Sequence, residues 1–474
     1  RMNKRIIALL MAGAMVGSMT GCAPKKAEVP AAPVTQGQET SGSETGEANA
    51  PSEKGVTISL WKWIPTEGVQ IDSVVEAWEK EHPEIHLDIT HVGEAAKVFQ
   101  KYSAALPAGE GPTILAMQVG ARANQFKDFC EPLAPYAVEK WGADWEDMFL
   151  DTALEQCRWS GDDYTVLPGG MTAAPAIEYN VNAFEKLGIT ELPKTLDDLY
   201  AIIEKSKADG QMIPGVGIGA KEGWTCRDVY MSIMNQIAPG KIYDAVDGKT
   251  SFTDAEFLEG MQIWKDMFDH GLFAEGSLGT ALYPDVNDNM MMGGSDGKKY
   301  YIMEVCGTWH GSSMTKAQIE EFAEQGNCDP ELHLGAFPFP TVKEGCEPNM
   351  AATVDIAWGI NKNATEEEKK AAFEFISWMA AGKGQEVFCN TLQVLPAAKN
   401  INMDAGKASL NGEKEVEALE MFENYVQNNV GNREIPYPEI SNALDNTLTA
   451  VAGGVMTPEE AVKSIQEASD SVSR

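Results

Sequence analysis

The sequence predicts an α/β fold with mixed sheets in the part of the chain that follows residue 54. Residues 56–60 alternate in the way typical of a strand, and the apolar residues at 71, 74, 75 and 78 then share one helical face. Residues 85, 87 and 89 alternate again, which completes a strand-helix-strand start. Short apolar runs keep recurring between amphipathic helices without an internal repeat, and this order predicts helices packed on sheets.

Helix starts further along are marked by a threonine with an acid three residues later, the pattern of a capping box. Gly188 and Gly271 stand where a left-handed residue would end a helix. Further short strands are expected at 113–117, 300–305 and 354–360. The threonine-acid pairs are Thr195/Asp198, Thr253/Glu256, Thr365/Glu368 and Thr457/Glu460.

Residues 1–21 have the layout of a secretory signal. Lys4 and Arg5 precede an apolar core that is shorter than the roughly 20 residues a membrane-spanning helix needs. The segment 19–22 (Met-Thr-Gly-Cys) resembles a bacterial lipobox, with Met in place of the usual Leu. The resemblance implies cleavage before Cys22 and acylation of its sulfur. The alternative is an ordinary signal peptide with an incidental cysteine.

Residues 22–54 follow as a lipidated cysteine and a flexible linker. The linker is rich in Ala, Pro, Thr, Ser, Gly, Gln and Glu and has no apolar periodicity. A coil of this length reaches on the order of 30 Å, so the folded part could reorient above a membrane. We therefore expect the protein outside the cytoplasm, held to the outer face of the cell membrane through Cys22.

The charge of the chain excludes one class of partner. Its formal charge is -34 at pH 7, and such an acidic surface repels nucleic-acid phosphates. Anionic lipid headgroups would be repelled for the same reason, so membrane attachment is expected through the lipid anchor only.

The cysteines do not form a complete disulfide framework. Besides Cys22 there are seven, an odd number, and no C-x-x-C pair or Cys/His spacing of a zinc site is present. Cys328 and Cys346 could form one bridge, and free buried thiols are the alternative. We expect no metal site and no cofactor.

Ten short segments follow one another along almost the whole mature chain: 58–63 (ISLWKW), 78–85 (WEKEHPEI), 111–114 (GPTI), 164–168 (YTVLP), 178–189 (EYNVNAFEKLGI), 192–199 (LPKTLDDL), 307–309 (GTW), 337–340 (FPFP), 371–376 (AAFEFI) and 395–396 (LP). In this order they resemble the bacterial extracellular solute-binding proteins of carbohydrate-uptake ABC transporters. Thr113 departs from the family pattern, where many relatives have Asp, and the long segment 285–299 is expected to reshape one wall of the site.

The resemblance implies a two-lobed, periplasmic-binding-protein-like (type II) fold whose lobes are linked by hinges. The hinge crossings would lie near 168–173, 352–357 and 393–397. Lobe 1 would comprise 55–170 plus 358–393, and lobe 2 would comprise 171–357 plus 394–474.

A sugar presents apolar faces and a rim of hydroxyls, so its site needs flat aromatic side chains beside polar groups. Aromatic residues with polar neighbours occur here near strand ends and at Gly-rich turns. For each tryptophan the alternative is core packing, for Asp355 it is a hydrogen bond at a hinge, and for the other polar residues it is simple solvation. The candidate ligand-binding residues are Trp61, Trp63, Glu67, Gln118, Trp224, Arg227, Trp309, His310, Asp355 and Trp358.

The sequence therefore predicts a monomeric, lipid-anchored receptor that captures a carbohydrate, preferably an oligosaccharide, and delivers it to ABC permease subunits with a separate ATPase. A receptor for a non-sugar solute, a secreted carbohydrate-active enzyme and a surface adhesin are the alternatives. No G-x-S-x-G or H-E-x-x-H motif supports an enzyme. The segment 293–299 fails as a phosphate loop, because Met292 and Lys299 occupy its defining positions.

Overall fold

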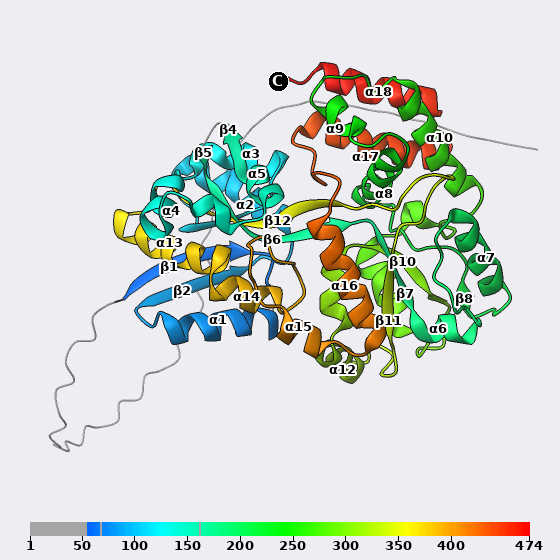
Figure 1. The fold of residues 1–474 in the computed structure, drawn as a ribbon, viewed down its shortest axis with the longest axis horizontal. Helices are drawn as coiled ribbons and strands as arrows, with labels where there is room; N and C mark the ends of the chain where they lie inside the picture. The colour runs from blue at the N-terminus through cyan, green and yellow to red at the C-terminus, as the bar shows by residue number, and fades with distance from the viewer. Residues whose placement is uncertain (1–54, 67–68, 161–162) are drawn as a thin grey trace, which may run out of the picture. The chain divides into compact units, whose positions relative to one another are not determined.

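The computed structural model describes residues 55–66, 69–160 and 163–474, and its main sheet has five strands in the order β2-β1-β3-β12-β6 (Figure 1). β1 runs parallel to β2 and β3, whereas β12 runs antiparallel to β3 and β6. The predicted α/β class with mixed sheets is thus confirmed. The predicted signal, Cys22 and linker lie outside the described residues. The strands are β1 (Val56–Lys62), β2 (Ile85–His91), β3 (Ile114–Met117), β12 (Ala351–Ile360) and β6 (Val166–Ala174).

A second, antiparallel sheet has the order β10-β7-β11, and the chain enters it from β6 after one residue, Pro175. The strand expected at 300–305 is divided at Ile302, because β9 pairs with β8 while β10 pairs with β7. The bounds are β7 (Ala176–Asn180), β10 (Met303–Cys306) and β11 (Leu334–Pro338), with the small pairs β4 (Arg158–Ser160) and β5 (Asp163–Tyr164), and β8 (Met212–Ile213) and β9 (Tyr300–Tyr301).

Helices cover both sheets (Figure 1). α13 packs on β1, β6 and β12, α16 packs on β11, and α8, α10, α17 and α18 pack on one another. The helices are α1 (Val69–Glu81), α2 (Ala95–Ala105), α3 (Ala121–Phe126), α4 (Ala134–Trp141), α5 (Asp151–Cys157), α6 (Val181–Lys186), α7 (Leu196–Lys207), α8 (Trp224–Ile237), α9 (Lys241–Val246), α10 (Ala255–Asp269), α11 (Asn287–Met292), α12 (Lys316–Glu324), α13 (Glu366–Ala381), α14 (Lys383–Cys389), α15 (Asp404–Ser409), α16 (Glu413–Gln427), α17 (Pro438–Ala452) and α18 (Pro458–Asp470), with short 3-10 and π segments that include η5 (Leu282–Val286) and η6 (Thr308–Met314).

Three of the four predicted capping boxes are confirmed, at the starts of α7, α13 and α18. The fourth prediction is wrong by one residue, because Asp254 is the residue before α10. The hydroxyl of Thr253 lies 2.7 Å from that of Ser251. The Thr253 side chain is therefore bonded within a local turn and does not cap the helix. Gly188 and Gly271 have the predicted left-handed backbone, with φ of 65° and 72°.

The three segments predicted as hinge crossings lie side by side. β6 pairs with β12 over most of their length, and Met171 of β6 also pairs with Leu395 in a single bridge. Buried apolar residues gather in two clusters, one centred on the five-stranded sheet and the other on α8, α10, α17 and the second sheet. The exact lobe bounds stay predictions.

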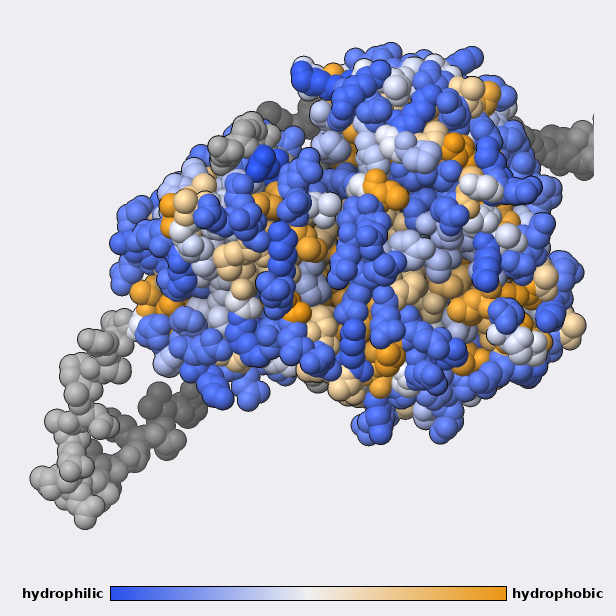
Figure 2. All heavy atoms as spheres, in the orientation of Figure 1, coloured by the Kyte–Doolittle hydropathy of each residue, from blue (hydrophilic) through white to orange (hydrophobic). Residues whose placement is uncertain are grey.

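Hydrophilic side chains dominate the face of the protein seen in Figure 2, with hydrophobic residues scattered among them. Among the described residues, no helix has the length and apolar character needed to cross a membrane. All seven cysteines of this part of the chain are free thiols, including Cys328 and Cys346, so the structure favours the free-thiol alternative.

Candidate functional site

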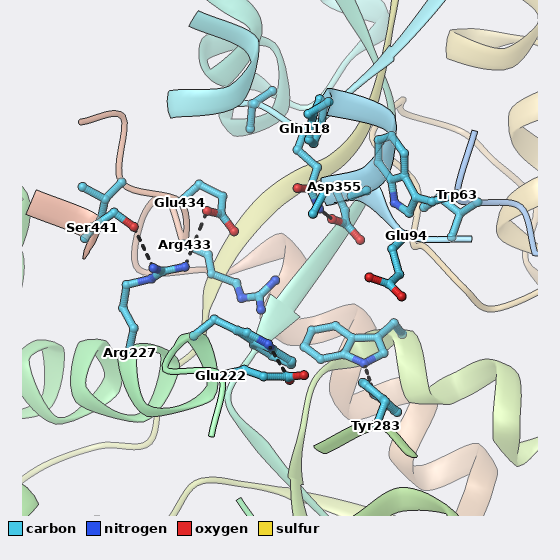
Figure 3. A pocket seen from close by; sticks show the side chains of 18 of the residues that line it. Trp63, Glu94, Gln118, Glu222, Arg227, Tyr283, Asp355, Arg433, Glu434 and Ser441 are labelled. Atoms are coloured by element: carbon cyan, nitrogen blue, oxygen red, sulfur yellow. Dashed lines mark hydrogen bonds and ion pairs between the residues drawn. The ribbon is translucent and has the colours of Figure 1, made fainter. Parts of the chain in front are cut away.

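A cavity of about 810 Å³ is lined by residues from strand ends, loops and helices. One wall comes from the residues after β1, the start of α2 and the end of β3. The other comes from the start of α8, from η5 and η6, and from the loop before α17 together with that helix. Figure 3 shows Trp63, Gln118 and Asp355 on one side of the cavity, with Glu222 and Tyr283 opposite them.

Aromatic side chains are present on both walls. Trp63, just beyond the end of β1, packs against Phe99 of α2 with ring centroids 5.7 Å apart. On the opposite wall the rings of Trp224 and Trp309 lie 6.1 Å apart at 59°. Trp309 donates its indole N–H to the hydroxyl of Tyr283 at 2.6 Å, which fixes the orientation of its ring. A flat apolar ligand could therefore contact an aromatic face on either side.

Arg433 contacts both tryptophan rings of the second aromatic wall. Its guanidinium carbon lies 4.8 Å from the ring centroid of Trp309 and 5.7 Å from that of Trp224. The same group donates two hydrogen bonds of 2.8 Å to the two oxygens of Asp228 in α8. Both residues are buried, so this bidentate pair fixes the position of Arg433.

Arg227 ties α8 to α17 at the edge of the cavity. Its guanidinium donates to both carboxylate oxygens of Asp445, at 2.8 and 2.9 Å, and to the hydroxyl of Ser441 at 2.7 Å. Burial raises the pKa of Asp445 to about 6, although Arg227 opposes that rise. The two arginines of the cavity wall are thus both already bonded to carboxylates.

Asp355 reaches the cavity because β12 is irregular at this residue. The pairing of β12 with β6 shifts between Val354 and Ile356, which leaves Asp355 out of the ladder. Its Oδ1 accepts a 2.8 Å hydrogen bond from Nε2 of Gln118. Burial raises the pKa of Asp355, against the opposing effects of Arg433 and Gln118.

Most of the residues predicted to bind ligand are brought together here. Trp63, Gln118, Trp224, Arg227, Trp309, His310 and Asp355 all line the cavity. Glu67 lies outside the described residues. His310 is almost wholly buried at the base of the wall, where its Nε2 meets the hydroxyl of Tyr283.

Trp61 and Trp358 do not line the cavity, and the physical reason is packing in each case. Trp358 is fully buried: its indole lies where a side chain on Gly169 would be, and it meets Phe375 edge to face. Trp61 stacks on Tyr102 of α2, with ring centroids 5.9 Å apart. For Trp358 the core-packing alternative describes the structure, whereas Trp61 is only partly buried and has Nζ of Lys101 4.5 Å from its ring centroid.

Several residues of the cavity wall were not among the candidates. Arg433, Glu434 and Asp445 come from the C-terminal part of the chain, where no aromatic residue had drawn attention to a site. Glu94 and Glu222 also line the cavity. Glu222 accepts a hydrogen bond of 3.2 Å from the indole of Trp224, two residues later. Its position next to Trp224, which was a candidate, is the sequence signal that could have identified Glu222.

The segment 285–299 contributes no residue to the cavity wall, contrary to expectation. The wall residue from this region is Tyr283, two positions earlier, in η5. The Met-rich part folds into α11, where Met290 and Met291 are buried.

Residues 63–386 match the family model described as "Bacterial extracellular solute-binding protein". A putative binding protein of Brucella abortus is 29% identical over 226 residues, which are 47% of this chain and 52% of that protein. The match thus spans about half the length of that relative. The multiple sugar-binding protein of Streptococcus mutans is 21% identical over 361 residues, covering 75% of this chain and 79% of that protein.

Solved structures resemble this one over most of its length. A chitin oligosaccharide binding protein has a TM-score of 0.68 and 20% sequence identity, with 88% of this chain and 98% of that chain covered. This likeness concerns the fold, and it confirms the predicted two-lobed, periplasmic-binding-protein-like architecture.

Proposed function

Because the chain belongs to the bacterial extracellular solute-binding protein family, we propose that it is a receptor that binds a carbohydrate, preferably an oligosaccharide, in the cavity described above. The observation that carries the proposal is the pair of aromatic walls, Trp63 on one side and Trp224 with Trp309 on the other, surrounded by polar side chains. Aromatic rings suit the apolar faces of a sugar, and the amides and carboxylates suit its hydroxyls.

The size of the cavity favours a ligand of more than one sugar ring. Small-molecule sites have volumes of roughly 300–1,000 Å³. At about 810 Å³ this cavity is near the upper end of that range. The chitin oligosaccharide binding protein that shares this fold points in the same direction.

The charge of the cavity wall disfavours a phosphate or another polyanion. Among the wall residues are five carboxylates and two arginines. Each guanidinium is already bonded to a carboxylate, so neither arginine offers a free positive charge to an anion. A neutral polyhydroxyl ligand meets no such repulsion. The wall carboxylates are Glu94, Glu222, Asp355, Glu434 and Asp445.

The ligand would bridge lobe 1 (55–170 plus 358–393) and lobe 2 (171–357 plus 394–474), and these bounds are part of the proposal. The side-by-side position of β6, β12 and the segment around Leu395 supports a hinge between them. A ligand shifts the balance between open and closed forms only by binding the closed form better.

The last step of the proposed role is delivery of the bound sugar to an importer. The closed receptor, a monomer without a cofactor, would dock on ABC permease subunits whose ATPase is a separate protein, and it would leave its ligand chemically intact. The segment 19–22, with its resemblance to a lipobox, supports a lipid anchor at Cys22 that keeps the receptor near its permease.

A thermal-shift screen with mono- and oligosaccharides, amino acids, peptides and polyamines tests the proposal. A ligand at about 100 times its Kd should raise Tm by roughly 5 to 10 °C. Trp309→Ala and Trp63→Ala should each weaken binding by roughly 10- to 100-fold, since such aromatic contacts are typical hot spots. Trp61→Ala is the matched control, because Trp61 stacks on α2 outside the cavity.

The outcomes separate the alternatives. A shift with a carbohydrate that is recovered intact supports the receptor. A shift with a non-sugar alone would support a receptor and contradict the carbohydrate assignment. Consumption of a sugar would indicate an enzyme. No shift with any compound would favour an adhesin.

A further inference from the structure

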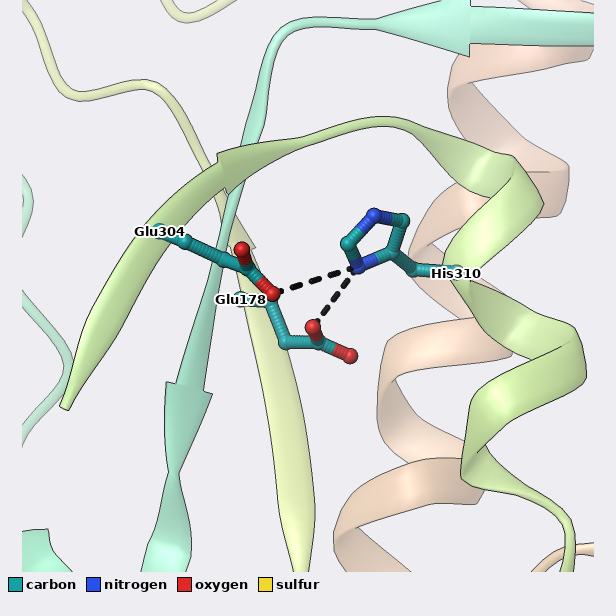
Figure 4. A group of neighbouring side chains, drawn as sticks. All are labelled: Glu178, Glu304 and His310. Atoms are coloured by element: carbon teal, nitrogen blue, oxygen red, sulfur yellow. Dashed lines mark hydrogen bonds and ion pairs between the residues drawn. The ribbon is translucent and has the colours of Figure 1, made fainter. Parts of the chain in front are cut away.

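Two glutamates and a histidine converge in the interior of the protein (Figure 4). Glu178 of β7 and Glu304 of β10 are directly opposite each other in the antiparallel ladder, and each is 0% exposed. His310 of η6 is 2% exposed, and its Nδ1 lies 2.7 Å from Oε2 of Glu178 and 3.7 Å from Oε1 of Glu304. One nitrogen and two carboxylate oxygens thus lie within 4.8 Å of one another.

Two buried carboxylates that face each other must be neutralised, either by protons or by a bound cation. Like charges directly opposite in a ladder repel, and burying a carboxylate is costly unless it is paired. In addition, Glu178 Oε1 and Glu304 Oε2 are buried without a hydrogen-bond partner. Unpartnered buried oxygens call for an explanation, and an ion held between the two carboxylates supplies one.

We infer that Glu178, Glu304 and His310 bind a divalent transition-metal ion of the Zn²⁺ class. Two carboxylates balance the charge of one divalent ion, and a neutral imidazole completes a mixed nitrogen and oxygen ligand set. The imidazole favours Zn²⁺ over Ca²⁺ and Mg²⁺, which prefer oxygen ligands. The two unpartnered oxygens would be available to bind the ion more closely.

The surroundings of the cluster match those of a metal site. Histidine ligands commonly donate their other ring N–H to an oxygen, and Nε2 of His310 meets the hydroxyl of Tyr283. Ligating carboxylates are themselves commonly hydrogen-bonded, and Oε1 of Glu304 accepts a 2.8 Å bond from Nδ2 of Asn287. The orientation of the ligand atoms is therefore set by residues outside the cluster.

The ion would connect β7, β10 and η6 beneath the cavity. His310 meets Tyr283, and Tyr283 accepts the indole N–H of Trp309, so the metal would hold the second aromatic wall in place. The inference concerns a second site and goes beyond the proposed carbohydrate binding. Its test measures metal content and does not depend on any sugar.

The test is to offer Zn²⁺ to the purified full chain, without a histidine tag, and to measure bound metal by mass spectrometry after gel filtration. We expect about one Zn²⁺ per chain. Glu304→Gln, which keeps the side-chain shape, and His310→Gln should each abolish binding. Asn287→Ala should weaken it by roughly 10- to 100-fold.

Glu415→Gln is the matched control. Glu415 is a buried carboxylate 3.0 Å from Nδ1 of His333, and its Oε2 also has no hydrogen-bond partner. Among the described residues it does not belong to a group of three possible ligand atoms, so this variant should keep its zinc. Co²⁺ offered in place of Zn²⁺ should give a visible ligand-field spectrum that is lost in Glu304→Gln. The inference is overturned if the wild-type chain retains no more Zn²⁺ than Glu304→Gln does, since a proton alone would then neutralise the glutamates.

Discussion

Asp355 illustrates how one residue position in a strand can serve a site. The pairing of β12 with β6 shifts register on both sides of Ile356, and Asp355 is left out of the ladder. Its carboxylate accepts a hydrogen bond from Gln118 at the cavity. Irregularities of this kind commonly redirect a side chain next to a functional site. The same residue therefore belongs to the proposed hinge and to the proposed ligand site.

The ionisation of Asp355 leads to a prediction about pH. Sugar hydroxyls donate to a carboxylate, so protonation of Asp355 should weaken binding. Because burial raises its pKa above the ordinary 3.8, affinity should be complete at neutral pH and fall as the pH drops through that raised value. Titration calorimetry at several pH values should show this loss.

The variant Asp355→Asn isolates this effect from the other acids nearby. Glu434, Asp228 and Asp445 also face this region, and the pKa of Asp445 is about 6. The variant should bind more weakly at neutral pH and depend less on pH than the wild type. An identical pH profile in both proteins would show that Asp355 does not accept a hydrogen bond from the ligand.

At the scale of elements, helix starts are determined by hydrogen bonds between near neighbours. In the capping box at α13, the hydroxyl of Thr365 accepts from the backbone N–H of Glu368, and the Glu368 carboxylate accepts from the backbone of Thr365. Thr253 has the same sequence spacing but bonds to Ser251 instead. The pattern therefore predicts a helix start well and its first residue less well.

This difference gives a prediction with an internal control. Thr365→Ala removes a real cap and should lower the free energy of unfolding by about 1 kcal/mol. Thr253→Ala removes no cap from α10 and should change it much less. Urea unfolding of both variants checks this, and equal losses would mean that Thr253 caps α10 in solution.

At the scale of the whole molecule, the aromatic walls make closure around a ligand the expected response. Trp63 follows a strand of the main sheet, whereas Trp224 and Trp309 belong to α8 and η6 on the other side of the cavity. A ligand that contacts both walls binds the closed form best and shifts the population towards it.

Small-angle X-ray scattering can measure this shift. The radius of gyration should fall when the sugar identified in the screen saturates the receptor, and a sugar that gave no thermal shift should leave it unchanged. A constant radius at saturation would contradict closure while leaving binding itself intact.

Much of the fold could be predicted because its signals are local. The strand-helix-strand start, three capping boxes and the glycines at 188 and 271 depend on residues a few positions apart. The order of family segments then predicted the architecture. Trp63, Trp224 and Trp309 were identifiable because each lies near an element end with polar residues beside it.

The rest depends on residues that are distant in the sequence. Asp228 and Arg433 are 205 positions apart, and neither pattern nor composition connects them. Trp358 packs on a glycine of the neighbouring strand, which could not be foreseen from its position near a predicted hinge. Glu178 and Glu304 meet only because β7 and β10 pair in one particular register. Short-range hydrogen bonds and apolar periodicity involve residues close together in the sequence, so the sequence alone predicts them. A cavity wall or a buried charge cluster forms only when strand register and packing bring distant side chains together.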